Sequence, residues 1–256
     1  MKIVMKFGGT SVASADKVKH VAHLIKSHSN GNEIVAVASA VRGMTDDLLQ
    51  ISESVRKGNK GDIEKFIDKV AKLHMDIANT SMTKAKTRDD LRSVLSAMIK
   101  ELEDVLSGMV LLGEVTSKSQ DYLLSFGERL ATPILCYALK DIGVKAEFLT
   151  GKDAGIITDS NYGEAKPLMD TTKLRVSNKI TPMLKNGIVP VVTGFVAADQ
   201  NGNITTLGRG GSDYTATIIA SCINADEVWL MTDVDGLMTA DPRIVKDANV
   251  LKEVSY

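Results

Sequence analysis

Residues 34–38 read IVAVA, an apolar and mostly β-branched run with no polar position. A strand with one face in water alternates apolar and polar residues, so this run is typical of a strand buried on both faces in a parallel sheet. Before it, apolar residues recur at helical spacing from Val18, which predicts a helix over 15–28 capped by Ser14. Strand and helix patterns that alternate in this way indicate an α/β fold.

The alternation of strand and helix patterns returns after residue 144. The patterns predict further strands and helices, and an Asn-Gly turn predicts a hairpin between 195–198 and 204–207. Pro133 is expected to bend or interrupt its helix, and Pro190 counts against a central place for its strand. The other predicted strands cover 3–5, 145–149, 188–193 and a buried run at 227–231, and the helices cover 119–140, 171–186 and 211–223.

Residues 45–109 carry helical spacing throughout and no strand pattern. We therefore predict a mainly parallel sheet covered on both faces, with a helical insertion at about 45–118. Since the sequence has no internal repeat and no clear linker, a single domain over 1–256 is the simplest interpretation.

The charge balance limits the classes of partner. The chain has 31 Lys and Arg against 32 Asp and Glu, a net charge of −1. Proteins that bind nucleic acid or anionic membranes usually carry a basic face, so neither partner is expected. Cys136 and Cys222 lie in apolar helical patterns and are interpreted as small core residues of a protein in a reducing compartment, not as a disulfide. With no signal peptide or membrane span in the sequence, a cytoplasmic protein is predicted.

Two glycine-rich segments follow predicted strands, at the edge of the sheet where α/β proteins bind ligands. Lys6 lies beside Gly8-Gly9, and Arg209 lies within 208–211. Successive glycines let backbone N–H groups approach an anion, and a following helix N-terminus adds positive charge. A lone Gly-Gly is more often a tight turn, but two such loops, each with a cation, favour a phosphate site. The spacing fits neither the P-loop nor the Rossmann pattern.

Four motifs in order make the sequence similar to aspartate kinases, within the amino acid kinase superfamily. The resemblance covers essentially the whole chain and implies an amino acid kinase-like three-layer sandwich. The motifs are KFGGTS at 6–11, SFGER at 125–129, GRGGSD at 208–213, and TDVDG at 232–236 followed by DPR at 241–243.

The resemblance implies transfer of the ATP γ-phosphoryl group to the β-carboxylate of L-aspartate, the first step of lysine, threonine and methionine biosynthesis. Lys6 is then expected to stabilise the transferring group, and Asp213 to orient Lys6. Arg209 would bind the substrate α-carboxylate and Glu128 its α-ammonium. Ser39, Thr45 and Ser212 would hydrogen-bond the substrate carboxylates.

For the nucleotide, the resemblance implies a set of contacts at both ends of the chain. Mg²⁺ is expected to be held mainly through the ATP phosphates, with no metal site formed by the protein itself. The expected ATP-binding residues are Lys6, Gly8, Gly9, Ser11, Thr232, Asp233, Met238 and Arg243.

Each assignment has a plainer alternative. Glu128 alone would be read as a surface helix residue, Thr45 and Asp213 as helix caps, and Asp241-Pro242 as a turn. Arg209, between glycines, is the hardest to explain structurally. At the level of function, the alternatives are an amino acid kinase-fold enzyme for another acid substrate and a non-catalytic regulatory protein that binds nucleotide or amino acid.

The family pattern continues beyond residue 256, with a Lys-Val-Leu-His-Pro-like segment and paired ACT domains. The expectation is therefore a catalytic domain that ends before its last segment. Association with an ACT-containing regulatory polypeptide, or a homodimer, is the expected partner relationship.

Overall fold

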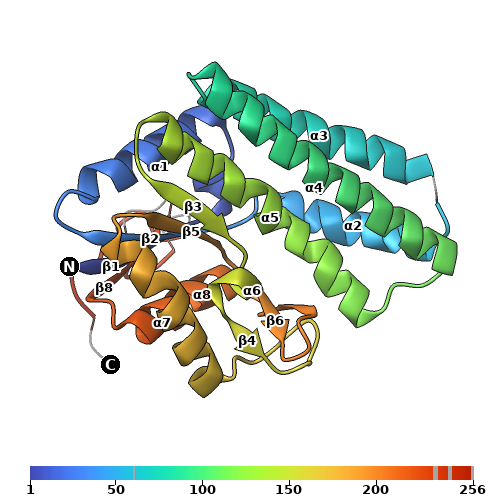
Figure 1. Ribbon diagram of the computed structural model, residues 1–256. Helices are drawn as coiled ribbons and strands as arrows, with labels where there is room; N and C mark the ends of the chain where they lie inside the picture. Colours follow the sequence, from blue (N-terminus) through green and yellow to red (C-terminus); the bar gives the residue numbers. More distant parts are fainter. Residues whose placement is uncertain (60, 233–235, 242–243, 255–256) are drawn as a thin grey trace.

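The computed structural model describes residues 1–256 except 60, 233–235, 242–243 and 255–256. Within this part, a central sheet has five strands in the order β3-β5-β2-β1-β8, and all neighbouring pairs are parallel (Figure 1). The predicted parallel sheet is therefore confirmed. Its strands are β1 (Lys2–Phe7), β2 (Glu33–Ala38), β3 (Ala146–Leu149), β5 (Val189–Thr193) and β8 (Glu227–Met231).

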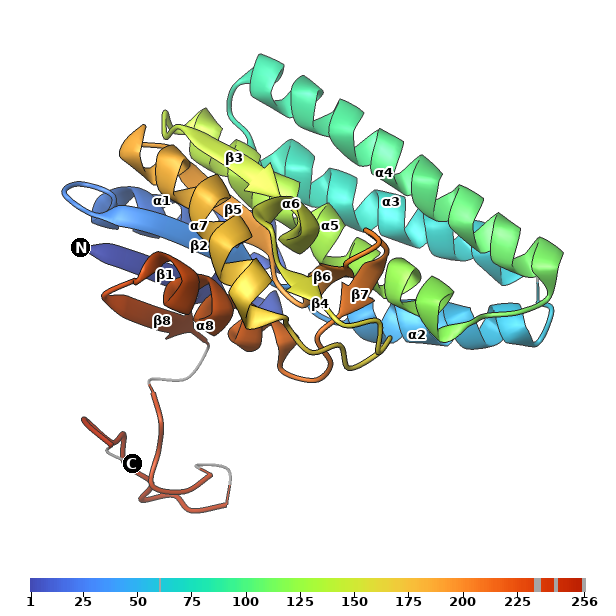
Figure 2. The same cartoon turned by 60° about the horizontal axis from the view of Figure 1, so that its bottom comes forward.

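Helices cover both faces of this sheet and make three layers (Figures 1 and 2). Alternate residues of β1 point to opposite sides, so Ile3, Met5 and Phe7 join one apolar cluster while Val4 joins the other. The first cluster is completed by α1 (Ala15–His28), capped by Ser14 as predicted, and α5 (Ser117–Asp141). The second is completed by α7 (Met169–Lys185) and α8 (Gly211–Ile223).

The predicted helical insertion consists of three helices that lie along α5 and extend beyond the sheet (Figure 2). Their apolar stripes include Leu48, Val70 and Leu95, and they continue the α1–α5 cluster without a break. In the described part of the chain, no helix is both long and apolar enough to cross a membrane. The three helices are α2 (Met44–Arg56), α3 (Gly61–Ser81) and α4 (Ala85–Leu112).

A second, small sheet has the order β4-β6-β7. It contains the predicted hairpin, in which β6 pairs antiparallel with β7 around the Asn201-Gly202 turn. Asp121 on α5 accepts hydrogen bonds from the Thr206 N–H (2.9 Å) and the Gly163 N–H (3.0 Å), which joins this sheet to the long helix. The elements of this region are α6 (Gly151–Ala154), β4 (Ile157–Thr158), β6 (Val196–Asp199) and β7 (Ile204–Thr206).

Pro190 lies in an inner strand, contrary to the sequence expectation. The Val189 N–H donates to Lys145 O on the β3 side, so alternation turns the Pro190 nitrogen toward β2. Pairing between β5 and β2 begins only at Val191 and Ala36. The N–H that Pro190 lacks would therefore lie outside the β2–β5 hydrogen bonds, so the proline breaks none of them. The sequence also predicted that Pro133 would bend or interrupt its helix, but α5 continues through Pro133 without interruption.

The strand at 227–231 exists, but the expectation that it is buried was wrong. β8 is an edge strand of the described sheet, and its residues are partly or fully exposed. Leu230 is 51% exposed. An apolar run alone does not distinguish an inner strand from an edge strand, because that difference depends on which elements pack beside it.

Candidate active site

A cavity of about 370 Å³ opens where β1 and β2 end and α8 begins. Segments far apart in the sequence supply its walls, as expected for the carboxyl edge of a parallel sheet. It brings together eight of the predicted site residues: Lys6, Gly9, Ser39, Thr45, Glu128, Arg209, Ser212 and Asp213.

Lys6 and Asp213 form an ion pair in this cavity, with Nζ 2.6 Å from Oδ1. Lys6 lies on the same face of β1 as Val4, which packs against α8, and Asp213 lies in the first turn of α8. The Lys6 side chain is only 15% exposed, so a carboxylate is needed nearby to balance its charge. The pair holds a cation beside the glycine-rich loop that follows β1.

Gly9 lets that loop touch the segment after β2. A Cβ atom at Gly9 would lie 2.6 Å from Ala40 O and 3.2 Å from the Arg42 nitrogen, so no larger residue fits. The Arg42 N–H donates to Gly9 O at 3.2 Å across this contact. The two loops therefore form one wall, and Gly9 begins a short 3-10 helix (Gly9–Val12) rather than the long helix α1.

Glu128 is buried in the wall of the cavity, with an exposed fraction of 4%. Its Oε2 atom has no hydrogen-bond partner among the described residues. Burial raises the pKa of this carboxyl from about 4.5 to about 8, and backbone hydrogen bonds of Ala40 and of Glu128 itself offset part of the effect. The plainer interpretation of Glu128 as a surface residue was wrong.

Gly127 explains how Glu128 comes so close to the loop after β2. A Cβ atom at Gly127 would lie 2.8 Å from the Ala40 Cβ, closer than two carbon atoms can approach without movement. α5 therefore presses its backbone onto Ala40, and the next residue enters the cavity.

The helix-cap alternatives for Thr45 and Asp213 were also wrong. Gly43 is the N-cap of α2 and Gly210 the N-cap of α8, and neither helix has a side-chain cap. Thr45 and Asp213 instead line the cavity, and Arg209 lies exposed on its rim.

Other predicted residues lie outside the cavity. Gly8 is the N-cap of the 3-10 helix Gly9–Val12 and Ser11 lies within that helix, where the Ser11 N–H donates to Gly8 O at 2.9 Å. Thr232 and Met238 follow β8 and do not line the cavity. Asp233 and Arg243 lie outside the described residues. Among the residues the structure describes, no three His, Cys, Asp or Glu side chains form a metal-ligating group.

Among the wall residues that the sequence analysis did not assign, Arg42 and Asp46 carry charge and Phe195 carries an aromatic ring. Arg42 lies in the segment between the end of β2 at Ala38 and the start of α2 at Met44, so its place at the carboxyl edge of the sheet was the available signal. Phe195 has a positive φ of 64°, which is unusual for a non-glycine residue and could not be read from its type.

Comparison with known proteins places the chain and its fold in one class. The family model described as the amino acid kinase family matches residues 1–256, and the chain therefore belongs to that family. Among curated relatives, aspartokinase 1 of Arabidopsis thaliana is 35% identical over 99% of this chain and 44% of its own length. The aspartokinase of Geobacillus stearothermophilus is 32% identical over 99% of this chain and 48% of its own.

A solved structure agrees with these relatives. Aspartokinase III of E. coli, in complex with aspartate and ADP, matches 98% of this chain and 53% of its own with a TM-score of 0.88 at 27% identity. The resemblance to aspartate kinases is confirmed by these matches. The chain spans about half the length of the curated relatives it matches.

Proposed function

We propose that this chain is the catalytic part of an aspartokinase, which transfers the γ-phosphoryl group of ATP to the β-carboxylate of L-aspartate. The observation that carries the proposal is a single cavity that holds both the Lys6–Asp213 ion pair and the unpartnered carboxyl of Glu128. The first suits a phosphoryl group, and the second suits an ammonium group.

Recognition of aspartate would rest on two opposite charges. Glu128 would bind the α-ammonium through its unpartnered Oε2, and the Arg209 guanidinium would bind the α-carboxylate with two parallel N–H donors. A zwitterion uses both groups, whereas a nucleotide substrate has no ammonium for Glu128. Ser39, Thr45 and Ser212 would hydrogen-bond the carboxylates from the same walls.

ATP would bind along the loop that follows β1. The Gly9 N–H and the Lys6 ammonium suit phosphate oxygens, and Ser11 adjoins them. The Gly8 N–H donates to Met231 O at 3.4 Å, a long bond that a phosphate oxygen would replace. Thr232, Asp233, Met238 and Arg243 complete the nucleotide contacts in this proposal. Mg²⁺ would be held through the ATP phosphates and would neutralise their charge.

The chemistry needs no general base, because an aspartate β-carboxylate is already ionised near pH 7. The protein's task is to align the carboxylate with the phosphoryl group and to balance the charge that spreads over the transferring oxygens. Lys6 is placed for the second task, and Asp213 keeps its ammonium in position.

An aspartyl-hydroxamate assay tests the proposal, because hydroxylamine traps an acyl phosphate but not the phosphate released by idle ATP hydrolysis. We expect trapped product with the chain and loss of product in Lys6→Ala and Arg209→Ala. Calorimetric binding of aspartate and ATP without product would indicate a catalytic part that needs further segments. No product and no aspartate binding would contradict the proposal and favour another acid substrate or a regulatory role.

Three finer expectations belong to the same proposal. These are a place in the synthesis of lysine, threonine and methionine, a cytoplasmic location, and association with a second copy or with an ACT-containing polypeptide. The assay above is independent of all three.

A further inference from the structure

A second cavity, of about 560 Å³, lies between the helical insertion and the small sheet. Its walls come from α4, α5, α6 and the turn between β6 and β7, and it shares no lining residue with the first cavity. Sites for small molecules typically have volumes of about 300–1,000 Å³, so this cavity is large enough for one.

One part of the cavity wall is apolar. Val105 and Met109 contribute from α4 and Ile204 from β7, while the Tyr122 ring contributes from α5. Met109 is 4% exposed, and its thioether is polarisable and adapts to the shape of a neighbour. This part of the wall favours a ligand with an apolar or aromatic body.

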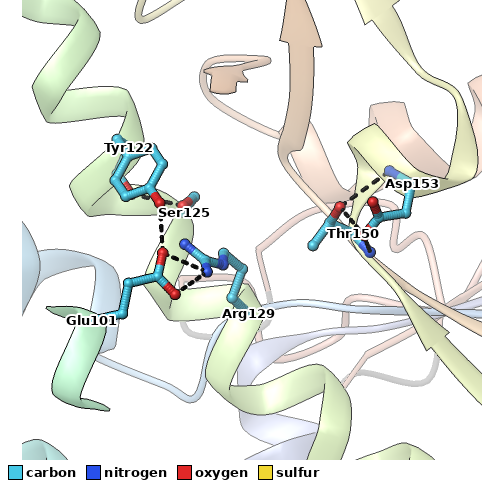
Figure 3. A network of polar contacts seen from close by, with 6 residues as sticks. All are labelled: Glu101, Tyr122, Ser125, Arg129, Thr150 and Asp153. Atoms are coloured by element: carbon cyan, nitrogen blue, oxygen red, sulfur yellow. Dashed lines mark hydrogen bonds and ion pairs between the residues drawn. The ribbon is translucent and has the colours of Figure 1, made fainter. Parts of the chain in front are cut away.

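The charged residues of the wall are mainly cationic. Lys118, Arg129 and Lys152 line the cavity, and Asp153 is the one carboxylate among its lining residues in the described chain. Asp153 already accepts a hydrogen bond from the Thr150 hydroxyl at 2.6 Å within the capping box of α6 (Figure 3). Glu101 balances Arg129 from α4, which leaves an excess of one positive charge.

Arg129 is held in a fixed orientation (Figure 3). Its Nη2 donates to both Glu101 oxygens, at 2.9 and 2.7 Å, and its guanidinium lies over the Phe126 ring at 4.4 Å. The Tyr122 hydroxyl donates to the same carboxylate. Both bonds to Glu101 use Nη2, so a ligand carboxylate in the cavity would accept from the remaining N–H groups of the guanidinium.

Lys152 is fixed at the other side of the cavity. Its Nζ donates to Gly202 O at 2.9 Å and so joins α6 to the β6–β7 turn. An ammonium can donate three hydrogen bonds, and this one uses a single donor in that contact. Lys118, in the first turn of α5, adds a second ammonium with no ion-pair partner among the described residues.

From this arrangement we propose that the second cavity is a binding site for a small monoanionic carboxylate with an apolar or aromatic body. The carboxylate would lie among Lys118, Arg129 and Lys152, with the body against Met109 and Ile204. An excess of one positive charge fits a monoanion, whereas a nucleoside triphosphate would bring more negative charge than these residues balance. Arg129 directly follows Glu128 on α5, so the two cavities contact successive residues of one helix.

Calorimetric titration with 3-phenylpropionate tests the proposal. We expect one site with a Kd of about 1 mM, a reasonable affinity for a ligand of this size. Two matched probes test the carboxylate charge and the aromatic body separately. The first, 3-phenylpropanamide, lacks the charge, and the second, propionate, lacks the aromatic body. Both are expected to bind at least tenfold more weakly.

Variants then locate the site. The double variant Lys118→Ala and Lys152→Ala is expected to weaken binding about tenfold, because each charge-assisted hydrogen bond contributes measurably. Lys100→Ala, a lysine on the outer side of α4 that pairs with Glu103 and Asp104, is the matched control and should bind like the parent. Binding should also persist when aspartate and ATP are present in excess.

Four results would overturn the proposal: no heat with 3-phenylpropionate, equal binding of the amide, equal loss in Lys100→Ala, or displacement by aspartate or ATP. Displacement would assign the probe to the first cavity. A circular dichroism spectrum of the double variant shows that its fold is retained, and since both lysines are exposed no folding defect is expected.

Discussion

The Lys6 ammonium lies 2.6 Å from the Asp213 carboxylate, although Lys6 lies near the end of the first strand and Asp213 in the first turn of the last described helix. Two packed elements make this contact possible: β1 in the sheet and α8 across its face. The ion pair places a charge-balanced lysine at the mouth of a cavity, which is the arrangement that a phosphoryl-transfer site needs.

Lys6→Ala is expected to lower kcat in the aspartyl-hydroxamate assay by about 100-fold to 1,000-fold, the usual effect of removing one donor to developing charge. Asp213→Asn should cost less, about tenfold, because the ammonium remains but loses its orienting partner. Lys17→Ala, an exposed lysine of α1, controls for a general effect of charge removal. Retention of more than half the parent rate in Lys6→Ala would contradict the role given to this residue.

Glu128 should make the protein less stable as pH rises. Its pKa is about 8 when folded and near 4.5 when exposed, so between these values the folded state binds a proton that the unfolded state has released. The free energy of unfolding then falls with pH across this window, and the total loss is about 3–5 kcal/mol.

Urea unfolding of the parent and of Glu128→Gln, from about pH 5 to about pH 9, measures this effect, because other groups cancel in the difference. The two proteins should be similarly stable at the acid end, with the variant increasingly more stable toward the alkaline end. A difference that stays constant with pH would show that Glu128 is ionised throughout.

Binding of aspartate should release a proton below about pH 8. The substrate ammonium beside Glu128 favours the ionised carboxylate, so the carboxyl must lose its proton as the complex forms. The affinity for aspartate is therefore expected to increase as pH rises toward the pKa of about 8. Calorimetry in two buffers of different ionisation enthalpy measures the number of protons released, which should approach one near neutral pH. Equal release by the parent and Glu128→Gln would assign the proton to another group.

Much of the fold could be predicted from the sequence because burial leaves local patterns. The run at 34–38 became the inner strand β2, and the spacing from Val18 became α1 with its predicted cap at Ser14. The Asn201-Gly202 turn became the β6–β7 hairpin. In each case the signal lies within a few residues of the element that it specifies.

Features that depend on packing between distant segments could not be predicted in this way. β4 has two residues and α6 has four, too few for a periodic pattern, and β8 lies at an edge although its composition resembles an inner strand. The same distinction between local patterns and distant packing applies to the candidate site. The resemblance assigned Lys6, Glu128 and Arg209 to one site with Asp213. The burial of Glu128 could not be predicted, because it follows from contact between α5 and the loop after β2.

That contact gives a last prediction, about Gly127. An added Cβ would lie 2.8 Å from the Ala40 Cβ and 3.6 Å from Leu48, so Gly127→Ala must move α5 or the loop. Overpacking of this kind costs about 1–3 kcal/mol of stability. Because Glu128 moves with α5 while Ser39 stays with the loop and Thr45 with α2, the KM for aspartate should increase about tenfold, with kcat changed much less.

Gly108→Ala is the matched control, since Gly108 also lies inside a long helix but has no atom within 4 Å of an added Cβ. Alanine there should stabilise α4 by up to about 1 kcal/mol through its helix propensity, and the KM for aspartate should not change. The comparison separates the two effects of a methyl group, because both variants gain helix propensity and only Gly127→Ala creates a clash. If Gly127→Ala bound aspartate as tightly as Gly108→Ala, close packing of α5 on Ala40 would not be what positions Glu128.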